Sequence, residues 1–169
     1  MYDWEREALG VDTLGQIRGA IRTRMRVDLL NPSAQAWWIA TLYGPDIWKT
    51  WRVGLLPGSI AAYVDPAVAL PDPLVLRLPE YLATSMEGVN EVWDRVAVAP
   101  VVVEKKALAF AACGIRQRDG DLDTTTPRER WELVAPTDLA ARLSLTDGKQ
   151  ISVRLLPASL HKPDAPHQR

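Results

Sequence analysis

The sequence predicts a mainly β protein: a single small closed β-barrel of about six or seven strands with two or three short helices. Short strand-like segments recur along the chain, and proline or glycine separates most of them. The chain has 169 residues, of which 47% are hydrophobic, so it can bury the core of one domain without disulfides or metals.

The first predicted strand covers residues 15–26, because apolar side chains and arginines alternate there. The apolar series is Ile17, Ile21, Met25 and the small Gly19 and Thr23, and the polar series is Arg18, Arg22, Arg24 and Arg26. Asn31 and Pro32 are expected to begin a helix that continues over residues 34–43 and ends at Gly44-Pro45. A further turn of helix is expected over residues 46–51.

The remainder of the chain predicts mainly strands. They are expected at residues 59–64, 74–78, 92–103, 107–115, 130–134 and 150–156. A short helix is expected over residues 79–86, and Thr137 is expected to cap another that reaches Leu143. The polar run 116–127 is expected to turn at Asp119-Gly120. We therefore expect a lead-in at 1–14, a barrel domain at 15–156 with a helical insertion at 32–52, and a disordered tail at 157–169.

The composition argues against several classes of protein. Cys113 is the single cysteine, so no intramolecular disulfide can form. The two histidines, His161 and His167, lie in the proline-bearing tail, which leaves the core without a histidine ligand or general base. A net charge of −1 argues against a generic binder of nucleic acid or anionic membranes. No apolar run approaches the roughly 20 residues of a membrane helix, and no secretory signal is apparent, so we expect a cytoplasmic protein.

Common catalytic motifs are absent from the chain. It contains neither of the phosphate-binding patterns G-x-x-x-x-G-K-[ST] and G-x-G-x-x-G, and no G-x-S-x-G. Glu129 and Glu132 lie three residues apart on a predicted strand, so they are expected on opposite faces. The arginine row of residues 18–26 has two interpretations. It can hold phosphate oxygens in bidentate fashion, or it can be a solvated face whose partners are nearby carboxylates.

One C-terminal segment resembles a known family. Residues 129–153 read ERWELVAPTDLAARLSLTDGKQISV. They resemble a motif of the archaeal-type CTP-dependent riboflavin kinases, E-x-x-E-[IL]-[IV]-A-P followed by a short helix and L-x-L-x-D-G-D-x-[IV]-x-[IV], with Lys149 in place of the last Asp of D-G-D. The resemblance covers about residues 17–156 and implies a cradle-loop type of β-barrel.

Two further segments carry the resemblance and depart from it. Residues 56–61, LPGSIA, resemble the family's P-Y-x-G-T-L-N, whose Thr and Asn are magnesium ligands beside the nucleotide phosphates. Ser59 keeps a hydroxyl at the Thr position, whereas Ala61 has no oxygen at the Asn position. Residues 19–27 align with a glycine-rich S-G-x-G-x-G loop, where Thr23 takes the Ser position and Arg24 and Arg26 replace glycines that allow close backbone approach.

The resemblance implies a divergent riboflavin kinase-like protein. Such a protein either phosphorylates riboflavin or a related small molecule, from CTP or another nucleoside triphosphate with Mg²⁺, or binds a flavin or nucleotide without catalysis. It implies Glu129 as the catalytic carboxylate and Ser59 as a metal ligand, with Asp65 as an additional carboxylate. The residues implied in binding are Arg22, Thr23, Arg24, Arg26, Pro57, Gly58 and Trp131. Trp131 would stack on a ring of the ligand or, alternatively, belong to the barrel core.

The tryptophans suggest an alternative function. The chain has seven Trp against one Phe. Four of them crowd into the segment that the resemblance does not explain: Trp37, Trp38, Trp48 and Trp51. The alternative is therefore a protein-interaction module in which these indoles contact a partner.

Overall fold

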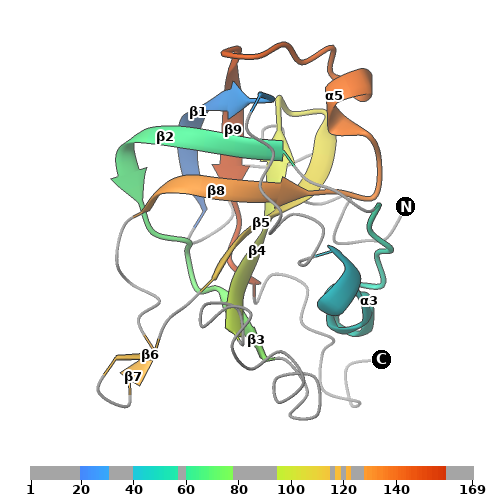
Figure 1. The fold of residues 1–169 in the computed structure, drawn as a ribbon, viewed down its shortest axis with the longest axis vertical. Helices are drawn as coiled ribbons and strands as arrows, with labels where there is room; N and C mark the ends of the chain where they lie inside the picture. The colour runs from blue at the N-terminus through green and yellow to red at the C-terminus, as the bar shows by residue number, and fades with distance from the viewer. Residues whose placement is uncertain are drawn as a thin grey trace.

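The computed structural model describes residues 20–30, 40–56, 60–77, 95–114, 117–118, 121–122 and 128–158. Its main strands are β1 (Ile21–Asp28), β2 (Ile60–Val68), β3 (Leu74–Arg77), β4 (Arg95–Val103), β5 (Ala107–Gly114), β8 (Arg128–Val134) and β9 (Gln150–Leu155). They form one sheet in the order β3-β4-β5-β8-β2-β1-β9, and β9 also pairs with β4 (Figure 1). Six strands thus close into an antiparallel barrel and β3 is an additional strand, which confirms the predicted fold class.

Two short elements interrupt the polar run before β8. They are β6 (Gln117–Arg118) and β7 (Asp121–Leu122), which pair with each other as a two-stranded antiparallel sheet. The expected turn at residues 119–120 lies outside the described residues and stays a prediction.

The barrel encloses the larger of two cores. Inward-facing side chains of all six barrel strands pack together there, and many of those from β4 and β5 are alanines. Small side chains on these strands leave room for Met25 and Trp131 from β1 and β8, which are 1% and 2% exposed. The barrel is therefore filled by its own side chains.

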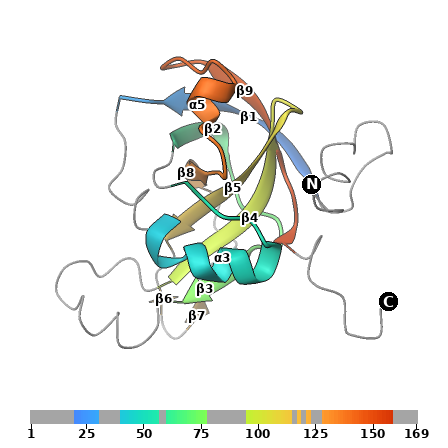
Figure 2. The same cartoon turned by 90° about the vertical axis from the view of Figure 1, so that its right-hand side faces the viewer.

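A second core lies between the outside of the barrel and the helix α3 (Gly44–Trp51). Figure 2 shows α3 against the part of the sheet formed by β3 and β4. The ring centres of Trp51 and of Phe110 on β5 lie 4.9 Å apart. Because β4 and β5 are buried on both faces, their sequences are continuously apolar and do not alternate.

The helix boundaries differ in part from those expected. Residues 40–42 are helical, Tyr43 separates them from α3, and Gly44 and Pro45 are the first residues of α3. Proline fits the first turn of α3 because no intrahelical partner awaits its missing N–H there. The helix α5 (Leu139–Arg142) is capped by Asp138, whose side chain accepts a hydrogen bond from the Ala141 N–H at 3.1 Å. The expectation that Thr137 caps this helix is therefore wrong.

Pro100 lies where β4 changes neighbours. Residues 95–98 of β4 pair with β3, and residues 101–103 pair with β9 along the same edge. A proline cannot donate to a sheet ladder, so it is tolerated at this junction between two partners. Its carbonyl oxygen accepts from the Leu156 N–H at 2.9 Å. None of the helices in the described part of the chain is long and apolar enough to cross a membrane.

Glu104 extends the β4–β9 pairing that closes the barrel. Its N–H donates to the Ser152 carbonyl at 2.8 Å, and its Oε1 accepts from the Ser152 N–H at 3.2 Å. Glu104 and Lys105 form the β4–β5 turn with φ of 52° and 58°. The side chain of Glu104 therefore adds one more bonded pair to the closing ladder.

Removing this side chain is predicted to weaken the closure. Glu104→Ala removes the acceptor of the Ser152 N–H and should lower the free energy of unfolding by about 1 kcal/mol. Glu104→Gln keeps an oxygen at the same place and should lower the free energy of unfolding clearly less. Urea unfolding of the two variants measures the difference, and equal stability of Glu104→Ala and the unmodified chain would contradict the role of Glu104.

Candidate functional site

The outer face of β1 carries a row of arginines. Arg22, Arg24 and Arg26 are exposed, whereas Met25 and Val27 between and after them are 1% exposed. The alternation follows from the period of two in a strand whose other face fills the barrel. The expected shared face of these three arginines is confirmed, and Arg18 lies outside the described residues.

Tyr63 of β2 joins two arginines from neighbouring strands. Tyr63 is directly opposite Arg26 of β1 and directly opposite Arg130 of β8. The Cζ atoms of Arg26 and Arg130 lie 5.5 Å and 5.3 Å from the centre of its ring. Arg130 also donates from Nη1 to the Tyr63 hydroxyl at 2.7 Å. These contacts fix the orientation of both guanidiniums across three strands.

Glu132 is a buried carboxylate at the end of this chain of contacts. Its side chain is 5% exposed, and its Oε1 lies 3.6 Å from Nη2 of Arg130, which is 33% exposed. A carboxylate removed from water needs a charged partner, and Arg130 supplies one. Arg130 therefore connects the buried Glu132 to the Tyr63 hydroxyl near the surface.

A second row of residues lies beside the first on the same outer face. Ala61 of β2 is directly opposite Asp28 of β1 and directly opposite Glu132 of β8. Side chains at such positions have Cβ atoms about 5 Å apart, so two carboxylates flank Ala61. Ala61 is fully buried, and it occupies the position at which the resemblance places a metal-ligating Asn.

The structure brings Glu132, and not Glu129, next to Ala61. Glu129 is exposed and lies three residues before Glu132, about 10 Å away along β8. The two side chains belong to opposite faces of the strand, as expected. A catalytic role for Glu129 stays a prediction, and Glu129 lies between two residues that pair with the Tyr63–Val68 half of β2.

The other predicted binding residues are spread over different surroundings. Thr23 is half-buried on the inward-facing side of β1, and its hydroxyl lies 3.5 Å from the Arg24 carbonyl. Trp131 packs in the barrel core, and its burial does not support stacking on a ligand. Asp65 is exposed on β2. Pro57, Gly58 and Ser59 lie outside the described residues, immediately before β2.

The described part of the chain contains no cluster of candidate metal ligands. No group of three or more His, Cys, Asp or Glu side chains that could hold a metal ion occurs among those residues. Asp28 and Glu132 flank Ala61, but Glu132 already faces the Arg130 guanidinium. Ser59, the predicted ligand, is outside the described residues, so its role stays a prediction.

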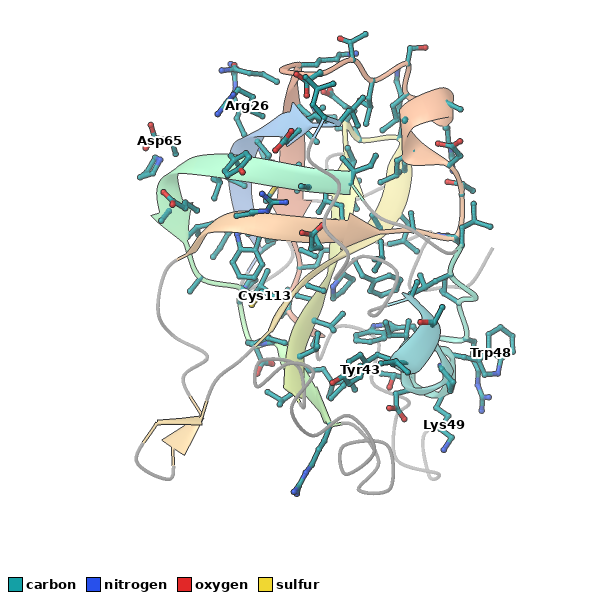
Figure 3. All side chains as sticks on the ribbon, in the orientation of Figure 1. Arg26, Tyr43, Trp48, Lys49, Asp65 and Cys113 are labelled. Atoms are coloured by element: carbon teal, nitrogen blue, oxygen red, sulfur yellow. The ribbon has the colours of Figure 1, made fainter. Side chains whose placement is uncertain are left out.

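The tryptophans of the alternative function are divided between core and surface. Trp51 is 1% exposed and packs in the second core, whereas Trp48 is 47% exposed. Figure 3 shows Trp48 beside Lys49 on α3, on the other side of the view from Arg26. Trp37 and Trp38 lie outside the described residues. Trp48 remains available to a partner, and a protein partner stays a prediction.

Reasoning from the sequence missed three residues that the structure adds to this face, Tyr63, Arg130 and Arg154, and it named Glu132 without placing it beside Ala61. Arg130 and Arg154 follow the same alternation that identified the arginines of β1, so each could have been assigned to an outer face. Their proximity to β1 depends on which strands pair, and the sequence carries no local signal of that pairing.

The sequence was compared with known proteins. No protein-family model matches it, and no curated protein matches it significantly.

The two glutamates of β8 offer a matched test of the buried pair. Glu132→Gln leaves the Arg130 guanidinium without its carboxylate and should lower the free energy of unfolding by about 1–3 kcal/mol. Glu129→Gln changes an exposed side chain and should stay within about 0.5 kcal/mol of the unmodified chain. Chemical denaturation measures both, and equal losses in the two variants would contradict the structural role of Glu132.

Proposed function

We propose that this chain is a riboflavin kinase-like barrel that binds a phosphate-bearing small molecule, a nucleotide or a flavin mononucleotide. The observation that carries the proposal is the row of exposed guanidiniums on β1, the strand that pairs with β2 beside the buried Ala61. Arginine presents several N–H donors in a rigid fork that suits phosphate oxygens.

The fold and the positions of the arginines both support the proposal. The closed six-stranded barrel is the architecture that the sequence resemblance implies. Arg24 and Arg26 stand at positions where the family has glycines, so side-chain donors would replace backbone N–H groups as phosphate ligands. Arg26 is already oriented by the Tyr63 ring, which lowers the entropy that binding would otherwise cost.

The same face favours binding over phosphate transfer. Magnesium bound beside phosphates needs protein oxygens, and Ala61 offers a methyl group where the family has an amide. The neighbouring Glu132 faces Arg130 at 3.6 Å, so its charge is balanced within the protein. The proposed function is therefore ligand binding that does not depend on magnesium.

Thermal denaturation with added ligand tests this function. A nucleoside triphosphate or flavin mononucleotide at about 100 times its Kd should add about 2.7 kcal/mol of stability, which is a rise of several degrees in Tm. Arg26→Gln should weaken binding at least severalfold, because one charged phosphate contact is lost. Arg77→Gln, an exposed arginine on β3, should leave binding unchanged.

Two comparisons decide the result. Riboflavin lacks a phosphate and should bind more weakly than flavin mononucleotide, with and without magnesium. Formation of flavin mononucleotide from riboflavin, CTP and magnesium would replace the binding function with the kinase function. No rise in Tm with any flavin or nucleotide would overturn the proposal.

A further inference from the structure

A fourth arginine joins the row on β1 from the neighbouring strand. Arg154 of β9 is directly opposite Arg22. On the same face, Ser152 is opposite Arg24 and Gln150 is opposite Arg26, and both are exposed. The polar face of β9 thus widens the arginine row of β1 into a two-stranded surface, which we call the β1–β9 face.

The β1–β9 face carries more basic than acidic residues, although the whole chain has a net charge of −1. The charged residues of these two strands are four arginines and one acid, Asp28, which lies at the last position of β1. Arg22 and Arg154 bring two positive charges to directly opposite positions of the two strands. The net charge of the whole chain therefore does not predict which ions this face attracts.

The spacing of the arginines indicates the kind of anion. Alternate residues of a strand lie about 6.7 Å apart, so Arg22, Arg24 and Arg26 span about 13 Å in regular steps. Successive phosphates of a polyphosphate share a bridging oxygen and lie much closer together than these steps. In nucleic acid a sugar separates successive phosphates, which spaces them more like the arginines. The β1–β9 face therefore fits an extended phosphodiester chain better than a compact oligophosphate.

We propose that the β1–β9 face binds single-stranded nucleic acid through its phosphodiester backbone. Arg22, Arg24, Arg26 and Arg154 contact the phosphates. Arg26 lies against the Tyr63 ring, so its guanidinium is held in place while its other side can stack on a base. Contacts of this kind do not distinguish sequences. The proposal does not rest on the binding of a flavin or a nucleotide described above.

Fluorescence anisotropy of a labelled oligothymidylate of about ten nucleotides, a length within the usual site sizes, tests the proposal. With three or four phosphate contacts, the logarithm of the association constant should fall against the logarithm of salt concentration with a slope of about −2 to −3. Arg154→Gln should weaken binding and make the slope shallower by about 0.7, whereas Arg154→Lys keeps the charge and should keep the slope.

Two further variants separate a specific face from general attraction. Ser152→Glu places a carboxylate opposite Arg24 without removing an arginine, and it should weaken binding while the Tm stays within a few degrees. Arg77→Gln removes an exposed arginine outside the face and should leave both the affinity and the slope unchanged. Equal weakening by Arg77→Gln and Arg154→Gln, or no binding at low salt, would overturn the inference.

Competition distinguishes this inference from the proposed function. Unlabelled oligothymidylate should displace the probe at far lower phosphate concentration than tripolyphosphate or CTP. Binding of CTP or flavin mononucleotide with no binding of the oligonucleotide would overturn this inference alone. Binding of the oligonucleotide with no binding of any flavin or nucleotide would overturn the proposed function alone. Equal potency of tripolyphosphate would overturn the choice of a nucleic-acid backbone.

Discussion

The pairing of β9 with both β1 and β4 is the constraint on which the rest of the structure depends. It gives each of the six barrel strands a neighbour on both sides, and it assigns one face of every strand to the interior. A slip of one residue between β1 and β9 would turn the arginines inward and Met25 outward. The burial of Met25, Ile151 and Val153 therefore sets the register that exposes the β1–β9 face.

The sequence was sufficient for the fold class and for the arginines of β1, because the first depends on many short strands separated by proline and glycine and the second on local alternation. It was insufficient for the relation between strands that lie far apart in the chain. Local alternation places Glu129 and Glu132 on opposite faces of β8, but the position of Glu132 beside Ala61 depends on the pairing of β8 with β2. Tyr63 illustrates the same limit, since its two arginines come from β1 and β8.

Other differences arise from competition between neighbouring residues. Thr137 and Asp138 can both cap a helix, and the structure uses the Asp138 carboxylate. The alternative function expects the indoles of the tryptophan-rich segment to contact a partner, but Trp51 of α3 packs in the second core and Trp48 is exposed. Trp48 and Trp51 are three positions apart and so lie on neighbouring sides of the helix. Which of the two indoles is buried therefore depends on how α3 packs against β5.

The central claim is that phosphate groups bind at the outer arginines of β1 and β9. NMR of the arginine Nε–Hε groups during titration with oligothymidylate observes these side chains directly. We predict concentration-dependent shifts for Arg22, Arg24, Arg26 and Arg154, with Arg77 and Arg142 unchanged. Shifts confined to Arg77 or Arg142, or equal shifts at all arginines, would contradict the claim.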